Sequence, residues 1–477
     1  MSPTVYEDAR QPHLQAMLAR LADEAERLTW PLERLHELRD ERLRTLLRHA
    51  KENSRWHAAR LAHVDPDAVT GADLSALPTM TKADVMANWD DIVTDPRLNL
   101  KVAQAHLDHV TEHGPAYLFD QYHVVTTGGS SGLTGLFPWD WEGWLEVGVG
   151  AWRLVPWLTR ELGLPVPGRG AFVGAAHASH ASDAIRATFD PPKDSPKVPV
   201  TLPLPEIVAR LNALQPDRIL AYPSIMWRLA LEQQAGRLDL KLNIVLVGAE
   251  PLYPHMRRTI EETFGAPVID FYGTSETWML ACSYPGRSEL HLVEDLIVYE
   301  FVDAQGNPVP PGRKAAKLLV TNTVNKVFPL IRYEIADEVA LLDTPNPGPW
   351  TGRRIAPVQG RHDDMFEYPG GVLVHPYVFW TPLWDSHIAQ YQVRQTPEGA
   401  DVVVELRSEF PLEPVRAALV AALREAGHPD PVVTVRAVDR IERSRISGKI
   451  RTFVPLPGSR TGAVPAAAVA PAAPAPV

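Results

Sequence analysis

The stretch Ala266-Pro267-Val268-Ile269-Asp270-Phe271-Tyr272-Gly273-Thr274-Ser275-Glu276 passes from an apolar run into a glycine, two hydroxyls and a carboxylate. Upstream, Ile244-Val245-Leu246-Val247 likewise ends in Gly248-Ala249-Glu250-Pro251. Ligands of open α/β sheets bind outside the carboxyl ends of strands, so the two stretches predict neighbouring strand ends that border one nucleotide crevice. Glu276 offers that crevice an oxygen ligand of the kind that Mg²⁺ prefers.

A glycine-rich segment gives an independent phosphate signal. Thr126-Thr127-Gly128-Gly129-Ser130-Ser131-Gly132-Leu133-Thr134-Gly135 directly follows the apolar run Tyr122-His123-Val124-Val125. Glycines let backbone N–H groups approach an anion, and the hydroxyls add donors. The segment lacks the Gly-Lys-Ser/Thr ending of a Walker A loop. A surface turn is the alternative, but the preceding strand and the downstream segments favour a phosphate loop.

Strand and helix patterns alternate through the middle of the chain. Strands are expected at 218–221 and 244–247, and helices at 207–214, 225–234 and 256–264. This alternation predicts a mainly parallel sheet. Two amphipathic helices are expected within 13–53, the second beginning at Pro31.

The rest of the chain divides by composition. Short strands joined by turns predict an antiparallel β subdomain at 296–343. Strands at 388–393, 402–406 and 432–435 with a helix at 415–425 predict a small α+β unit. The fold class is therefore α/β, with a large N-terminal domain (1–360) that has mainly parallel sheets plus a β subdomain, and a small mobile C-terminal α+β domain (361–457). The Ala/Pro-rich tail, 458–477, is expected to be disordered because it has too few bulky side chains to pack.

Charge and cysteine content narrow the class of protein. The chain has 477 residues and a formal net charge of −11, which argues against a nucleic-acid partner. Its single cysteine, Cys282, excludes an internal disulfide and a cysteine-based zinc cluster. We find no pattern of an export signal and no long apolar stretch, so neither export nor membrane insertion is expected. These observations fit a cytoplasmic protein, and a homodimer is compatible with them.

In combination, the motifs resemble those of the adenylate-forming superfamily, which includes acyl-CoA synthetases, peptide-synthetase adenylation domains and luciferases. The resemblance is to its phenylacetate-CoA ligase-like branch and covers almost the whole chain. Besides the three segments above, the matching elements in order are Leu77-Pro78-Thr79-Met80-Thr81-Lys82-Ala83-Asp84, Tyr222-Pro223-Ser224, His291-Leu292-Val293-Glu294-Asp295, Pro329-Leu330-Ile331-Arg332-Tyr333-Glu334-Ile335-Ala336-Asp337, Gly360-Arg361-His362-Asp363-Asp364-Met365 and Ser447-Gly448-Lys449-Ile450-Arg451.

The resemblance implies roles for individual residues. Glu276 would hold Mg²⁺, Lys449 would bridge the acyl carboxylate and the α-phosphate of ATP, and Thr274 would join them as a catalytic residue. Asp363 would be the hinge of the small domain. The implied ATP-binding residues are Thr127, Ser130, Ser131, Gly132, Thr134, Gly135, Gly248, Ala249, Glu250, Pro251, Asp270, Phe271, Tyr272, Gly273, Asp337 and Arg361. Asp337 would accept hydrogen bonds from the ribose hydroxyls, and Tyr272 or Phe271 would cover the adenine.

The implied activity is ATP-dependent adenylation of a compact hydrophobic, aromatic carboxylic acid, with release of pyrophosphate and transfer to an acceptor. ATP, Mg²⁺ and CoA are the expected cofactors and co-substrate. The acid would contact His177, Tyr222, Trp227 and Trp278, although core packing is the alternative role for the tryptophans. The chain departs from the family where it has Leu136 in place of a lysine after the phosphate loop, Glu334-Ile335-Ala336 before Asp337, and Gly370 in place of an arginine.

Three alternatives remain open from the sequence. The acceptor can be an amine or nitrite in place of CoA, or the protein can be an adenylate sensor without turnover. Gly128-Gly129-Ser130-Ser131-Gly132 also fits the G-x-S-x-G elbow of α/β-hydrolases, with Asp337 and His375 downstream. The glycines and proline after Ser130 disfavour the helix that such an elbow requires. His177 and His180 lack a third metal ligand nearby and are interpreted as loop or pocket residues.

Overall fold

The computed structural model describes most of the chain. The described ranges are 3–127, 135–165, 168–174, 181–189, 196–200, 202–358, 366–370, 372–374, 377–383, 387–406, 408–443 and 450–456. Outside them lie Ser130, Ser131, Gly132, Thr134, His177, His180, Arg361, Asp363, His375, Lys449 and the 458–477 tail. The roles predicted for those residues stay predictions.

An eight-stranded sheet forms the centre of the molecule, in the order β15-β9-β8-β7-β6-β5-β3-β4. Its strands are β3 (Gly170–Gly174), β4 (Lys197–Pro199), β5 (Arg218–Ala221), β6 (Ile244–Gly248), β7 (Val268–Thr274), β8 (Trp278–Ser283), β9 (Leu290–Leu292) and β15 (Arg354–Ile355). β4, β3, β5, β6 and β7 pair in parallel, and β8, β9 and β15 extend the sheet antiparallel. The expected α/β fold with a mainly parallel sheet is confirmed.

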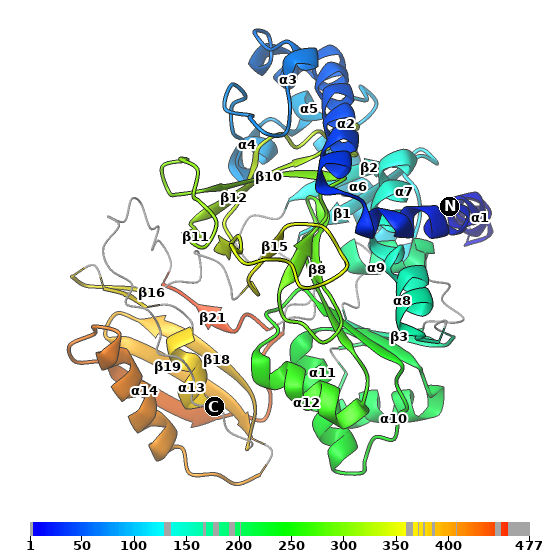
Figure 1. Cartoon of the computed structure of the whole chain (residues 1–477). Coiled ribbons are helices and arrows are strands. Elements are labelled where there is room, and N and C mark those ends of the chain that lie inside the picture. The colour runs from blue at the N-terminus through cyan, green and yellow to red at the C-terminus, as the bar shows by residue number, and fades with distance from the viewer. Residues whose placement is uncertain are drawn as a thin grey trace.

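Helices cover both faces of this sheet (Figure 1). One face carries α10 (Leu204–Leu214), α11 (Pro223–Gln234) and α12 (Pro254–Phe264), and the other carries α7 (Trp141–Trp152), α8 (Leu154–Leu162) and α9 (Ala181–Phe189). Strand side chains alternate between faces. Val245 and Val247 accordingly pack with α10–α12, whereas Ile244 and Leu246 belong to the larger core that includes α7–α9. The helices expected at 207–214, 225–234 and 256–264 are all present and begin two or three residues earlier.

The strand expected before the glycine-rich segment is present but lies outside the parallel sheet. β1 (Tyr122–Thr126) pairs antiparallel with β2 (Leu136–Asp140), and these two strands form a sheet of their own. The segment 127–135 therefore connects two antiparallel strands. A nucleophile elbow connects a strand to a helix, so this topology disfavours the hydrolase alternative for Ser130.

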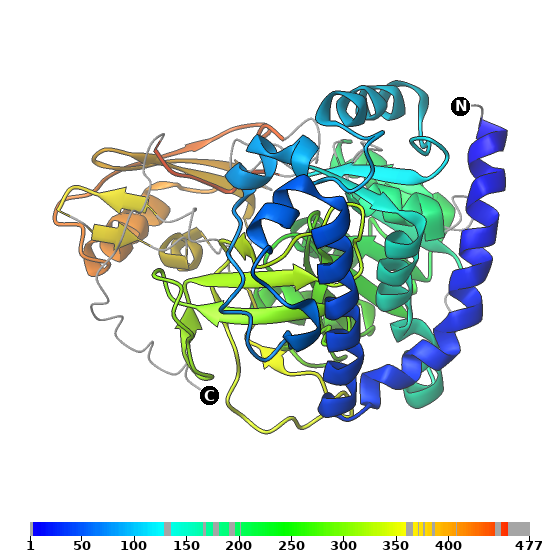
Figure 2. The same cartoon turned by 90° about the horizontal axis from the view of Figure 1, so that it is seen from above.

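An antiparallel β subdomain follows the central sheet, as expected for 296–343. β10 (Ile297–Val302), β12 (Lys317–Asn322) and β13 (Tyr333–Ile335) form a three-stranded sheet, and β11 (Lys314–Ala315) pairs with β14 (Val339–Ala340). The N-terminal helices are α1 (Pro3–Glu26), α2 (Leu32–Asn53), α3 (Arg55–Arg60), α4 (Lys82–Ala87), α5 (Trp89–Ile92) and α6 (Leu100–His113). α1 runs along the side of the molecule opposite the C-terminal elements (Figure 2).

The C-terminal elements have a hydrophobic core of their own. They comprise β16 (Phe366–Tyr368), β17 (Val372–Val374), α13 (Tyr377–Leu383), β18 (Ile388–Thr396), β19 (Gly399–Leu406), α14 (Glu413–Glu425), β20 (Val432–Ala437) and β21 (Phe453–Val454). β20, β19, β18 and β21 form one sheet. This unit lies beside α11 and α12 in Figure 1, and Arg228 of α11 donates a hydrogen bond to Gln390 of β18 at 3.0 Å.

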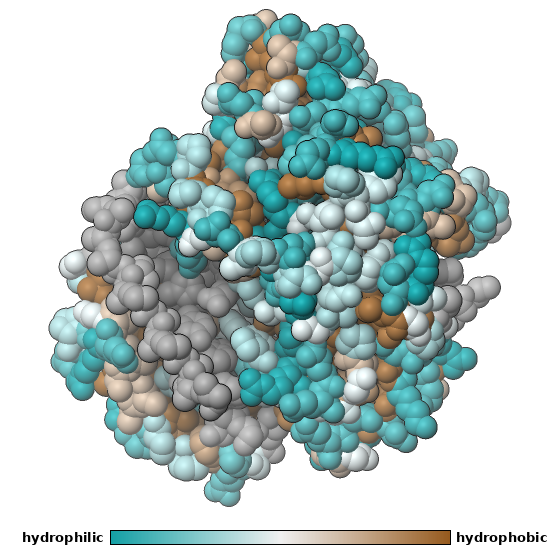
Figure 3. Space-filling view, in the orientation of Figure 1, coloured by the Kyte–Doolittle hydropathy of each residue, from teal (hydrophilic) through white to brown (hydrophobic). Residues whose placement is uncertain are grey.

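None of the helices in the described part of the chain is long and apolar enough to cross a membrane. On the face drawn in Figure 3, hydrophilic residues predominate among the coloured atoms, and hydrophobic residues are scattered in small groups.

Candidate active site

A cavity of about 540 Å³ lies between the central sheet and the helices α7–α9. Its lining includes Tyr222 just after β5, Gly248 at the end of β6 and Thr274 at the end of β7. These strands are parallel neighbours, so their carboxyl ends meet at one edge. The structure thus brings together the two stretches that the sequence predicted to border a single crevice.

The polar end of this cavity is built around Glu276. Tyr333 donates its hydroxyl hydrogen bond to Glu276 Oε1 at 3.2 Å, and Lys82 Nζ lies 3.9 Å from the same oxygen. Glu276 is only 9% exposed and lines the cavity. Glu276 is therefore a buried carboxylate that faces the cavity, not an ordinary surface acid.

The single carboxylate of Glu276 fits a Mg²⁺ ion that is bound together with a nucleotide. No cluster of three or more metal-ligating side chains occurs within the described ranges. Mg²⁺ typically takes one or two carboxylates plus substrate phosphates and waters, so a single carboxylate beside a phosphate loop suffices.

Lys82 is a site residue for which the sequence analysis predicted no role. Its Nζ donates a hydrogen bond to Thr127 Oγ1 at 2.9 Å, across 45 residues of sequence. Thr81 and Asp84 form a capping box at the start of α4, which fixes the helix turn that carries Lys82. The available signal was the Leu77–Asp84 motif. Leu136, which stands where the resemblance implies a lysine, is buried in β2, whereas Lys82 places its ammonium at Thr127, in the segment predicted to be the phosphate loop.

Hydrogen bonds close the neck of that loop and attach it to β7. Thr127 N–H donates to Gly135 O at 3.1 Å, and Gly135 N–H donates to Thr127 Oγ1 at 2.9 Å. Ser275 Oγ donates to Thr126 O at 3.0 Å. The two ends of the phosphate loop are therefore held beside Glu276, although 128–134 lie outside the described residues.

A second wall of the cavity carries the residues expected to bind adenosine. Tyr272 lines the cavity and donates its hydroxyl hydrogen bond to Asp337 Oδ2 at 2.8 Å. Gly248 and Gly273 allow close backbone packing, because a Cβ at either position would lie 2.7 Å from Phe271 O or 2.5 Å from Trp278 O. Ala249, which follows Gly248, has a φ of 67°. The backbone at this wall is thus fixed in a form that few other residues would accept.

Three further residues with predicted roles line the cavity. Phe271 and Tyr222 line the cavity from β7 and from the end of β5. Trp278 also lines it and has a φ of 66°, an uncommon conformation for a bulky residue. Strain of this kind collects at functional sites, which supports the predicted substrate contact of Trp278.

Four predicted site residues are not part of the cavity wall that the described residues form. Glu250 accepts a hydrogen bond from Ser224 N–H at 3.2 Å, and Pro251 follows it away from the lining. Trp227 packs edge-on against His255 beside the core of the opposite sheet face. Asp270 is buried on β7, one residue out of phase with Ile269 and Phe271, which line the cavity. Burial raises the pKa of Asp270 to about 7, against the opposing effect of Arg257. The ligand contacts predicted for these four residues, a backbone contact in the case of Glu250, stay predictions, since the described cavity wall does not include them.

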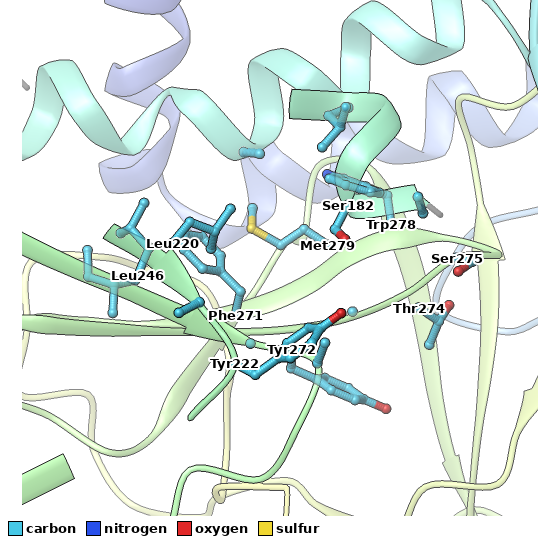
Figure 4. A pocket seen from close by; sticks show the side chains of 18 of the residues that line it. Ser182, Leu220, Tyr222, Leu246, Phe271, Tyr272, Thr274, Ser275, Trp278 and Met279 are labelled. Atoms are coloured by element: carbon cyan, nitrogen blue, oxygen red, sulfur yellow. The ribbon is translucent and has the colours of Figure 1, made fainter. Parts of the chain in front are cut away.

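The other end of the cavity is apolar (Figure 4). Leu220, Leu246 and Met279 lie along it, with Phe271 between the two leucines and the polar residues Thr274 and Ser275. The cavity therefore joins a chamber for an apolar group to a polar region beside the phosphate loop.

The C-terminal segment also reaches this cavity. Ile450 and Arg451 belong to its lining, and β21 then pairs in parallel with β18. Both residues directly follow Lys449, which lies outside the described ranges. The described residues Ile450 and Arg451 therefore contact the cavity, although Arg451 stays exposed.

The chain is similar in sequence to curated phenylacetate-coenzyme A ligases. It is 27% identical over 400 residues to the enzyme of Pseudomonas putida, covering 79% of this chain and 82% of that protein. It is 26% identical over 418 residues to the enzyme of Thermus thermophilus, covering 84% and 88%. None of the searched family profiles matches the chain.

Solved structures share the fold. A 2-hydroxyisobutyryl-CoA ligase in the postadenylation state, in complex with R3-HIB-AMP, superposes with a TM-score of 0.70 at 18% identity, over 91% of this chain and 92% of that one. The same ligase in its thioesterification state superposes with a TM-score of 0.56 at 19% identity, over 90% and 91%.

Proposed function

Because the chain is a member of the adenylate-forming superfamily, in its phenylacetate-CoA ligase-like branch, we propose that it activates a hydrophobic carboxylic acid with ATP and transfers the acyl group to CoA. The observation that carries the proposal is the two-ended cavity, in which an apolar chamber meets Glu276 and the neck of the phosphate loop. The names of the relatives support CoA as the acceptor.

In the first step a carboxylate oxygen of the acid attacks the α-phosphorus of ATP. A new O–P bond forms, the bond to the β-phosphate breaks, and pyrophosphate leaves. Both reactants are anionic, so the site has to hold them together with cations and donors. Lys82 and Thr127 act at the phosphates, Lys449 bridges the acid and the α-phosphate, and Asp337 with Tyr272 holds the ribose and adenine.

Mg²⁺ would be held by Glu276 and would neutralise charge on the phosphates as pyrophosphate leaves. Thr274 lies two residues before Glu276, lines the cavity and exchanges a hydrogen bond with Thr277 at 3.0 Å. This contact fixes the turn that presents Glu276, and Thr274 itself faces the cavity, where the resemblance implies a catalytic role.

In the second step the thiol of CoA attacks the acyl carbon, the acyl–O bond breaks, and AMP leaves. The reactants of the first step would fill the cavity. CoA therefore needs another route to the acyl carbon, which a different arrangement of the C-terminal part would open. We propose that rotation at Asp363 withdraws Lys449 and opens that route. The closer superposition on a postadenylation form supports a starting arrangement with Lys449 at the site.

The experiment that tests this function is a pyrophosphate-exchange screen over aryl and short acyl acids, followed by mass spectrometry with CoA, amines and nitrite as acceptors. Exchange with an aromatic acid and formation of its thioester are expected. Pyrophosphate exchange without thioester formation would indicate that the acceptor is an amine or nitrite and not CoA. No exchange with any acid would reject the ligase function.

A further inference from the structure

The apolar chamber runs along whole strands. β5 lines it from Arg218, its first residue, to Ala221 and the following Tyr222, and β6 lines it from Ile244 to Gly248. At a rise of about 3.3 Å per residue, four residues of strand span about 13 Å. A single ring with a one-carbon spacer would fill only about half of this length.

The walls of the chamber are apolar on both sides. Ile244 and Leu246 contribute from the sheet, and Val155, Leu158 and Ile185 contribute from α8 and α9. Figure 4 shows Leu220 and Leu246 on the far side of Phe271 from Thr274 and Ser275. An acid whose carboxylate reaches the polar end therefore extends its body past Phe271 toward the first residues of the strands.

The far end of the chamber is polar again. Arg218 is 7% exposed, and its Cζ lies 5.2 Å from the centre of the Trp152 ring, which also lines the chamber. A guanidinium has five N–H donors in a planar fork and no acceptor, so it can hold neighbouring protein groups and still offer a donor to a ligand. The group that it would recognise on the acid is a hydrogen-bond acceptor.

We propose that the acid substrate is elongated, with a carboxylate at one end, an aromatic body and a hydrogen-bond acceptor such as a phenolic oxygen at the other end. Arg218 is the residue that determines specificity for that acceptor. This inference rests on the proposed function and specifies its substrate class. It predicts a preference for aryl-alkenoic over simple arylacetic acids.

The first test compares acids with the unchanged protein. Pyrophosphate exchange is measured with benzoate, phenylacetate, cinnamate and 4-hydroxycinnamate. We expect kcat/KM to rise along this series, and 4-hydroxycinnamate to exceed cinnamate by about tenfold, as for one hydrogen bond to a charged group. Equal use of cinnamate and 4-hydroxycinnamate, or a maximum at phenylacetate, would overturn the inference. Absence of exchange with every acid would instead reject the proposed function.

The second test uses variants at the far end and in the middle of the chamber. Arg218→Met should abolish the preference for 4-hydroxycinnamate over cinnamate, and Arg218→Lys should restore part of it. Leu246→Trp should shift the preference toward benzoate and phenylacetate by at least tenfold, because the indole would fill the middle of the chamber. Arg258→Met is the matched control, since Arg258 is exposed on α12, on the opposite face of the sheet. An unchanged preference in Arg218→Met that still melts cooperatively would contradict the role of Arg218.

Discussion

Tyr272 donates its hydroxyl hydrogen bond to Asp337 Oδ2 at 2.8 Å, which joins the end of β7 to the connection between β13 and β14. The neighbouring Tyr333 of β13 donates to Glu276. The β subdomain therefore positions two carboxylates of the site, one at the adenosine end and one at the phosphate end. Residues far apart in the sequence become one binding surface through these two tyrosines.

The first prediction concerns the Tyr272–Asp337 pair. Asp337→Ala should weaken ATP binding by about 1–3 kcal/mol, since it removes a buried acceptor for the ribose hydroxyls. Tyr272→Phe should have a smaller effect, because the carboxylate stays in place. Isothermal titration with ATP would measure both. Equal affinity of Asp337→Ala and the unchanged protein would remove Asp337 from the nucleotide site.

Glu276→Gln should abolish ATP-dependent turnover, because an amide cannot offer Mg²⁺ an anionic oxygen. The measurement is pyrophosphate exchange over a range of Mg²⁺ concentrations. Glu262→Gln is the control, since Glu262 is an exposed carboxylate on α12. Near-normal exchange of Glu276→Gln at low Mg²⁺ would show that the metal role is misassigned.

The contact of Lys82 with Thr127 predicts a phosphate-binding defect in Lys82→Met. The loss of one preorganised charge at a reacting phosphate should lower kcat/KM for ATP by about 10²-fold. Lys101→Met, which changes an exposed lysine of α6, should leave the exchange rate unaltered. Normal ATP kinetics of Lys82→Met would contradict the hypothesis that Lys82 replaces the lysine that the resemblance implies at position 136.

Local patterns were enough to predict the strand ends that carry the site. The apolar runs at 244–247 and 266–271 end in glycine and polar residues, and parallel strands bring such ends to one edge. The same periodicity predicted α10–α12 and the antiparallel subdomain. These helices and strands follow from the spacing of apolar and polar residues, which can be read directly from the sequence.

Contacts between residues far apart in the sequence could not be predicted from local patterns. Lys82 of α4 contacts Thr127 across 45 residues of sequence, and the Leu77–Asp84 motif marks the segment without indicating that partner. β2 contains Pro138, which weakens a strand prediction, although a two-stranded sheet tolerates it. Trp227 packs with the core on the α10–α12 face of the sheet, and the sequence does not tell which face α11 covers, so its predicted substrate contact stays a prediction.

Asp270 predicts a pH-dependent contribution to stability. Its pKa is raised from 3.8 to about 7 in the folded protein by burial. The folded state therefore holds the proton more tightly, so this stabilisation is fully present below about pH 4 and is lost as the pH rises toward 7. At about 1.4 kcal/mol per pH unit the loss is on the order of 4 kcal/mol. Asp270→Asn should lack this decline, which urea unfolding at several pH values would measure. Parallel pH profiles for both proteins would contradict the prediction.

Lys449 separates a two-step ligase from a static nucleotide-binding protein. Its neighbours Ile450 and Arg451 line the cavity, which is the arrangement that the first step needs. Lys449→Ala should cut adenylate formation by about 10²-fold, since a charge between two anions is lost. Supplied with synthetic acyl-adenylate, the same variant should transfer the acyl group to CoA at close to the normal rate, because the proposed rotation withdraws Lys449 before that step.

The two half-reactions can be measured separately, by pyrophosphate exchange and by thioester formation from the adenylate. Lys101→Ala provides a lysine control at an exposed position of α6. Equal impairment of both steps would contradict a rotation that removes Lys449, since one side chain would then serve both arrangements. Impairment of neither step would leave Lys449 as a surface cation, and the cavity contact of Ile450 and Arg451 would then position the C-terminal segment without contributing a charge to the reaction.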